Sequence, residues 1–102
     1  MSKIFQLIDS QFIAVEKHSS DCVLMQFSSG VLAVYNPMEF IGFSDISDLV
    51  SSNVMDAYVT NEHIVIRFSV EASVHVSLHD ADFTGPEAAV YKSNSGSVVV
   101  FN

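Results

Sequence analysis

Hydrophobic and polar residues alternate most regularly between His63 and His79. In the first half of this stretch one side of the alternation holds Ile64, Ile66, Phe68 and Val70, and in the second half one side holds Val74, Val76 and Leu78. A period of two is typical of an extended strand that has one buried face and one solvent-facing face. The polar break at residues 71–73 has about the length of a hairpin loop. The pattern therefore predicts an antiparallel hairpin with these apolar residues directed into a core.

Shorter alternating runs, separated by Ser, Asp, Gly and Pro turn signals, predict further strands along the chain. These runs cover residues 11–17, 22–28, 31–35, 54–60, 87–92 and 97–101. Alternation fails between Met38 and Asn53, where Ser44 and Asp45 favour the start of a short helix or 3₁₀ turn over residues 44–50. The last run, Val98–Phe101, is apolar on both sides, and this predicts a strand that is central or covered on both faces.

An internal similarity organises these strands. Residues 23–28 resemble residues 64–69, and each segment follows a strand and a polar turn. This similarity predicts two three-strand meanders packed face to face, with the C-terminal hairpin completing one of the sheets; the alternative is that any two hairpins look alike at this level. We expect a single all-β domain over residues 1–102 with at most one short helix. Its architecture is predicted to be an antiparallel β-sandwich or half-open barrel of about eight strands.

The charge of the chain limits its partners. Twelve Asp and Glu residues oppose four Lys and Arg residues, so the formal net charge is −8. Such a surface repels nucleic acid and anionic membranes, and we expect neither as a partner. A basic protein would be attracted and steered towards it. The alternative is that the charge only keeps the fold soluble.

Three features bear on the compartment. Cys22 is the only cysteine, so an internal disulfide is impossible and a reducing compartment is the simpler inference. Its apolar neighbours favour a buried, inert thiol. The apolar run near the start of the chain is interrupted by Gln6 and Asp9, and we expect neither a signal peptide nor a membrane span. These features predict a cytoplasmic protein.

No residue pattern predicts catalysis. His75 and His79 would lie roughly 13 Å apart in a strand, which is too far for one metal ion. Asp80, Asp82 and Glu87 share one loop without the glycine and glutamate offsets of a calcium site. Paired carboxylates could perform acid–base chemistry, but only within a cleft that gives them unlike pKa values. We expect no enzyme activity, no catalytic residue, no metal and no cofactor.

Three segments of the chain carry a resemblance to a known family. These are the meander at residues 23–35, its similar segment at 64–78, and the tail that runs from Gly85-Pro86-Glu87 to the strand at 97–101. In these segments the chain resembles the small β-rich immunity proteins of bacterial contact-dependent growth inhibition (CDI) systems. This resemblance implies a small cytoplasmic protein that binds a cognate toxin domain and covers its active site. Many such toxins are basic nucleases, and one class is similar to pancreatic ribonuclease. Carboxylates of the immunity protein can then occupy positions where the nuclease would bind phosphate.

Candidate partner-binding residues are acids in loop-like segments, since binding residues collect on loops held by a rigid scaffold. Two segments, 39–48 and 80–87, contain Glu39, Asp45, Asp48, Asp80, Asp82 and Glu87. Whether the two segments meet at one end of the fold is left open by the sequence. Two other functions also remain open. Eight Phe residues could line the cavity of a small ligand-binding barrel, and an exposed apolar patch or strand edge could make the protein an oligomeric subunit.

Overall fold

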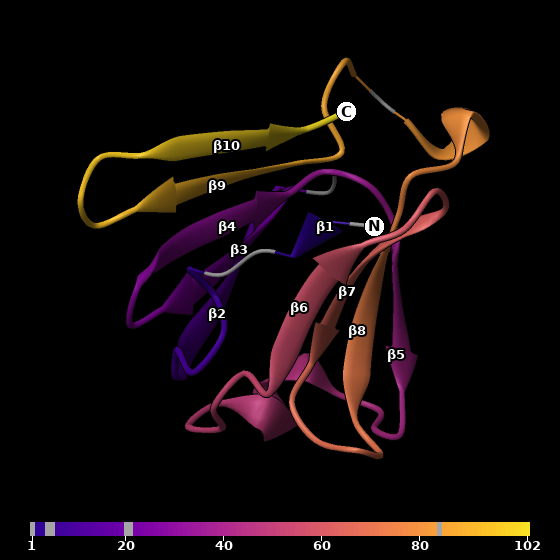
Figure 1. The fold of residues 1–102 in the computed structure, drawn as a ribbon. Coiled ribbons are helices and arrows are strands. Elements are labelled where there is room, and N and C mark those ends of the chain that lie inside the picture. The colour runs from indigo at the N-terminus through magenta and orange to yellow at the C-terminus, as the bar shows by residue number, and fades with distance from the viewer. Residues whose placement is uncertain (1, 4–5, 20–21, 84) are drawn as a thin grey trace.

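A computed structural model describes residues 2–3, 6–19, 22–83 and 85–102. The described strands form two five-stranded antiparallel sheets. The two sheets pack face to face (Figure 1). This arrangement confirms the predicted all-β antiparallel sandwich. No helix in the described part of the chain is long and apolar enough to cross a bilayer.

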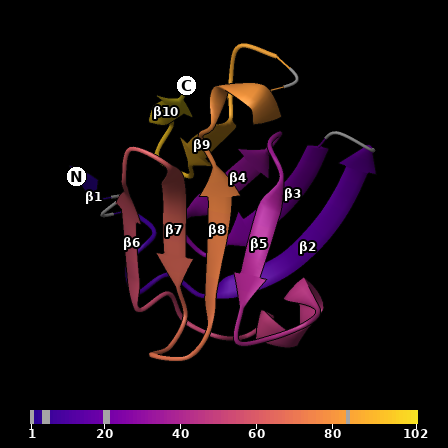
Figure 2. The same cartoon turned by 90° about the vertical axis from the view of Figure 1, so that its right-hand side faces the viewer.

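Sheet I has the strand order β1-β6-β7-β8-β5 and faces the viewer in Figure 2. Its strands are β1 (Ser2–Lys3), β5 (Met38–Ile41), β6 (Asp56–Val59), β7 (His63–Arg67) and β8 (Ser73–Ser77). The hairpin predicted around residues 63–79 forms its centre, with Ile66 of β7 opposite Val74 of β8.

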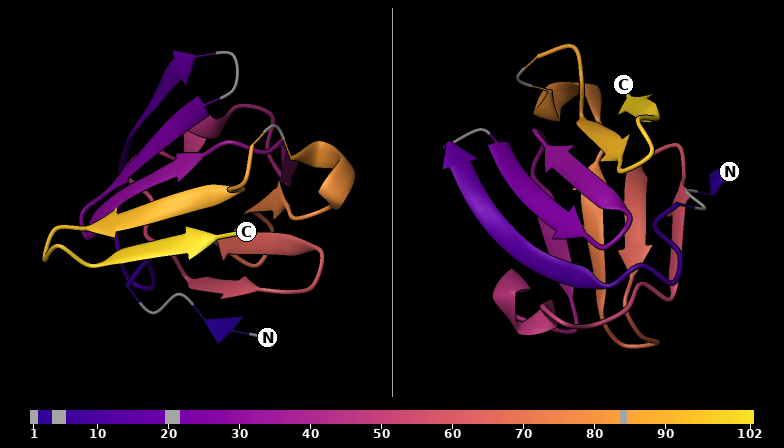
Figure 3. Two further views of the ribbon diagram at one scale, coloured as in Figure 1. Left: turned by 90° about the horizontal axis from the view of Figure 1, so that it is seen from above. Right: turned by 90° about the vertical axis from the view of Figure 1, so that its left-hand side faces the viewer.

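Sheet II has the order β10-β9-β4-β3-β2 and is seen from its outer side in the right panel of Figure 3. Its strands are β2 (Phe12–Ser19), β3 (Cys22–Phe27), β4 (Gly30–Val34), β9 (Ala89–Ser93) and β10 (Val98–Phe101). The two predicted meanders are β2-β3-β4 and β6-β7-β8. The C-terminal hairpin completes sheet II by pairing β9 with β4, as predicted.

Some elements differ from the sequence prediction. The 3₁₀ helix η1 (Ile46–Leu49) lies within the predicted helical turn, but a second one, η2 (Asp80–Asp82), was expected to be loop. The strand β5 was not predicted, because its alternation spans only four residues after a proline. With β1 it brings the described strands to ten rather than about eight.

The core between the sheets is built from the inward side of the alternation. Phe12, Phe27 and Phe68 form a ring cluster there, with centroid distances of 5.3 Å from Phe12 to Phe27 and 5.7 Å from Phe12 to Phe68. Ile66 is fully buried beside them, so the predicted inward face of β7 is confirmed. The prediction for Val70 was wrong: β7 ends at Arg67, and the Val70 side chain is 79% exposed in the following loop.

The last strand, β10, also differs from its prediction. It lies at the edge of sheet II, paired only with β9, and its outward side chains Val98 and Val100 are 56% and 46% exposed. The prediction that β10 is central or covered on both faces was therefore wrong, although both of its sides are apolar.

The turn from β3 to β4 is locked to β9 by a close backbone approach. A Cβ atom on Gly30 would lie 2.3 Å from the carbonyl oxygen of Lys92 and 2.9 Å from the Tyr91 hydroxyl, so only glycine fits. The buried Tyr91 hydroxyl lies 2.6 Å from Ser29 Oγ, which donates to Ser10 Oγ at 3.0 Å. This hydroxyl network satisfies polar groups at the edge of the core.

Candidate functional site

The outer face of sheet I is polar. Alternation directs Ile64, Ile66, Val74 and Val76 into the core, and it directs the intervening residues of β7 and β8 outwards. Most of these outward positions, with those of the neighbouring strands, are polar or charged: Glu39, Asp56, Tyr58, His63, Arg67, Ser73, His75 and Ser77. Val65 and Ile41 are the apolar residues among them. An antiparallel sheet with one solvated face normally has this composition.

A depression of about 430 Å³ lies on this face, at the end of sheet I that is next to η2. We call it the histidine depression. It is lined by Pro37, Met38, Glu39, His63, His75, Ser77, His79 and Asp82. These residues come from β5, β7, β8 and η2 and from the segments just outside them, and none of them is Lys or Arg.

His63 lies at the centre of three imidazole rings. Its ring centroid is 5.6 Å from that of His75 and 5.5 Å from that of His79, and both contacts are edge-to-face. The proximity of His63 to the other two histidines was not predicted from the sequence, because His63 is on the neighbouring strand β7. His79 lies beyond the end of β8, so the even strand spacing assumed between His75 and His79 does not extend to it. Within the described ranges no group of three or more His, Cys, Asp and Glu residues is arranged to hold a metal ion.

Hydrogen bonds fix the junction between β8 and η2. Ser77 Oγ donates to Asp82 Oδ2 at 2.5 Å, and the His79 backbone N–H donates to Ser77 Oγ at 3.1 Å. On β8 itself, Ser73 Oγ lies 3.0 Å from Nε2 of His75. The Asp82 carboxylate is therefore held at the rim of the depression.

The pKa of His75 is lowered from its ordinary value of 6.5. Partial burial is the main cause, and the positive charges of His63 and Arg67 act in the same direction, whereas Glu39 opposes them. His75 is therefore neutral at pH 7. The depression consequently offers carboxylates and at least one uncharged imidazole, an arrangement suited to guanidinium and ammonium groups.

The six acids predicted to bind a partner do not lie together. Glu39 and Asp82 line the histidine depression, and Asp80 is in η2 beside it. Asp48 lies in η1 and Asp45 directly precedes it, at the opposite end of sheet I in Figures 1 and 2. The Asp45 side chain accepts hydrogen bonds from the backbone N–H of Ser47 at 3.0 Å and from its hydroxyl at 2.8 Å, which lower the pKa of Asp45. Asp45 therefore caps η1.

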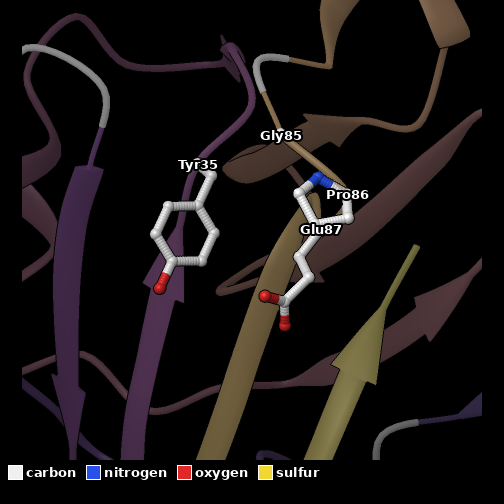
Figure 4. A pocket seen from close by; sticks show the side chains of 4 residues that line it. All are labelled: Tyr35, Gly85, Pro86 and Glu87. Carbon is white, nitrogen blue, oxygen red and sulfur yellow. The ribbon is translucent and has the colours of Figure 1, made fainter.

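Glu87, the sixth acid, lies just before β9 of the other sheet. Its side chain and that of Tyr35 flank a small hollow of about 220 Å³ that Gly85 and Pro86 complete. Figure 4 shows the phenol of Tyr35 and the carboxylate of Glu87 extending in the same direction over β4 and β9. Glu87 is thus separated from the histidine depression, although it follows Asp82 closely in sequence.

The hollow at Glu87 adjoins a larger groove on the outer face of sheet II. This apolar groove, of about 480 Å³, is lined by Cys22, Leu24, Val31, Ala33, Tyr35, Glu87, Val90 and Lys92. Cys22 is only partly buried there, so the prediction of a buried thiol was wrong. The sequence contains the signal for the groove, since Leu24, Val31, Ala33 and Val90 occupy the outward positions of strands whose inward positions are also apolar.

Comparison with protein-family models, with curated proteins and with solved structures yields no match.

Proposed function

We propose that this protein is an immunity protein that binds a cognate basic toxin domain in the cytoplasm and covers its active site. The observation that carries the proposal is the charge at the η2 end of sheet I. Glu39 on β5 and Asp82 in η2 are brought to one depression by different elements, Asp80 flanks it, and the lining contains no Lys or Arg.

This arrangement suits a nuclease as the toxin. The active site of a nuclease presents Lys, Arg or protonated His where it binds phosphate. Carboxylates spaced around a polar depression can pair with those cations, and the charge of −8 accelerates the encounter. The resemblance to CDI immunity proteins points to the same partner class, with a ribonuclease, including one similar to pancreatic ribonuclease, as the favoured activity.

Co-expression with the protein domain encoded beside the gene for this chain tests the proposal. We expect a stable complex on gel filtration and stoichiometric loss of the toxin's ribonuclease activity. Charge reversal of Glu39 should restore part of that activity, whereas reversal of Asp48 at the opposite end should not. A complex that forms equally well with both variants, or a toxin that remains fully active within the complex, contradicts the proposal.

A small-molecule carrier is the less favoured function. Phe12, Phe27 and Phe68 pack against one another inside the sandwich and fill space that a ligand-binding barrel would keep open.

A further inference from the structure

The outer faces of the two sheets differ in chemistry. On sheet I the outward positions are mainly polar or charged, as expected for a solvated face. On sheet II they carry Leu24 on β3, Val31 and Ala33 on β4, and Val90 on β9. Exposed Val98 and Val100 on β10 lie opposite Lys92 and Val90 and extend this surface to the sheet edge. A contiguous apolar surface of this kind marks a site of protein association.

The charge on this surface indicates which partner covers it. The groove lining contains one acid, Glu87, and one base, Lys92, so it is locally neutral in a chain that carries −8. Residues 88–102, which form β9 and β10, contain no acid at all. A further acid, Glu16, lies on the edge strand β2, opposite Leu24. Two copies of this acidic chain can therefore approach through this face with little repulsion, whereas a basic toxin gains little attraction from it.

From these features we infer that the outer face of sheet II binds a second copy of the same chain to form a two-fold symmetric dimer. Glu87 and Lys92 lie near opposite ends of the groove, at either end of β9. The two-fold axis would lie in the plane of contact and run perpendicular to β9. It would place β9 of the second copy antiparallel to β9 of the first. Glu87 of each copy then lies over Lys92 of the other, and the apolar side chains between them pack together.

This dimer uses a surface separate from the histidine depression, which lies on the outer face of the opposite sheet. The further inference is therefore independent of the toxin partner. The two associations also differ in their dependence on ionic strength. Salt screens both the repulsion between two acidic copies and the two Glu87–Lys92 attractions, so dimer affinity should change little with salt, whereas toxin association should slow at high salt.

Sedimentation of the purified full chain over a range of concentrations tests the proposal. We expect the wild type to form a dimer, and Val31→Asp to weaken it by about tenfold or more. The new carboxylate would be desolvated in the contact and, being directly opposite Lys92 on β9, would compete with Glu87 of the second copy for that ammonium group. Val70→Asp is the matched control: it adds the same charge at a highly exposed valine outside the groove and should leave the dimer intact. Far-UV circular dichroism and the melting temperature of each variant verify that it is folded.

A charge exchange tests the predicted geometry even if Val31→Asp does not fold. Glu87→Lys and Lys92→Glu should each weaken the dimer by about tenfold, since each places like charges opposite one another at both symmetric positions. The double variant should recover the affinity of the wild type to within a few-fold. A wild-type protein that stays monomeric up to about 100 μM overturns the proposal, as does a double variant no better than the single ones. Loss of toxin binding rather than of self-association in Val31→Asp would also overturn it.

Discussion

Glu39 on β5 lies directly opposite His75 on β8, where the two strands pair at the edge of sheet I. The cross-strand position brings a carboxylate to an imidazole that is also close to His63. Glu39 raises the pKa of His75, but partial burial together with the charges of His63 and Arg67 lowers it by more. Protonation of His75 is thus less favourable in the folded chain than in the unfolded one.

This balance predicts a specific pH dependence of stability. Between the lowered pKa of His75 and its ordinary value of 6.5, the unfolded chain binds more protons than the folded one, so the free energy of unfolding rises with pH. The contribution is complete above about pH 6.5 and is lost as the pH falls through the folded-state pKa. His75→Gln should reduce the slope of the melting temperature between pH 5 and 7, whereas substitution of the exposed Asn94 by Gln should not. If the His75 variant keeps the same dependence of melting temperature on pH as the wild type, His75 is not the source of that dependence.

A second prediction concerns the aromatic core. Phe68→Ala removes a buried ring in contact with Phe12, and we expect a loss of about 3–5 kcal/mol in the free energy of unfolding, measured by urea denaturation. Val70→Ala, two positions along and largely exposed, should change it by less than about 0.5 kcal/mol. Equal losses at the two positions would show that the assignment of inward and outward positions is incorrect.

A third prediction uses the close approach at Gly30. Gly30→Ala forces the turn away from the backbone of β9, with an expected cost of about 1–3 kcal/mol. Gly85→Ala is the control, because a Cβ atom there meets nothing within 4 Å and Gly85 has no positive φ. If thermal denaturation ranks Gly85→Ala as the more damaging change, the approach of β4 to β9 is not as described.

A fourth prediction separates the two acidic ends of the molecule. Asp80 and Asp48 are exposed acids in 3₁₀ helices at opposite ends of sheet I. On the proposed function, Asp80→Lys should slow association with the proposed toxin partner by about five- to tenfold at low salt, and Asp48→Lys should have little effect. Asp82→Asn should mainly speed dissociation of the complex. Among single substitutions at the six acids, one or two should each reduce the binding free energy by more than about 2 kcal/mol. Stopped-flow association rates at two salt concentrations check this, and equal effects of the Asp80 and Asp48 variants would reject the location of the interface.

A fifth prediction is that the three histidines do not form a metal site. An equimolar addition of Zn²⁺ should shift the melting temperature by less than about 1 °C, because an ion that binds only the folded state would stabilise it. Elemental analysis of protein purified without chelators should find no stoichiometric zinc. A large stabilisation by Zn²⁺ that His63→Ala abolishes would contradict this prediction.

The sequence predicts the long strands because their alternation is a local property. Ile64 and Ile66 are correctly assigned to the core from a period of two, and the similarity of β3 to β7 correctly predicts two meanders. The short edge strand β5 is missed, since four residues carry too little periodicity. The edge position of β10 is missed for a different reason. Val98 and Val100 are apolar, which suggested a covered face, but no other part of the described chain covers them.

The candidate site is less predictable, because it depends on contacts between strands. Glu39 and Asp82 were chosen from the sequence for their charge and loop-like context, and they do line one depression. Asp45 was chosen on the same grounds, yet its carboxylate caps η1 at the other end of the sheet. His63 was not considered a partner of His75, because only the register between β7 and β8 brings their rings together.

The pairing of β4 with β9 has a consequence for how the chain folds. Gly30 pairs with Ser93 and Val34 with Ala89, so every strand of sheet I except β1 is synthesised between the two halves of sheet II. The local β6-β7-β8 meander can form early, while β4 keeps an unpaired edge until β9 leaves the ribosome. Pairing over such a sequence separation is slow, and an exposed edge is open to mispairing during that interval. Closure of β9 onto β4 is therefore the step at which folding of this sandwich competes with aggregation.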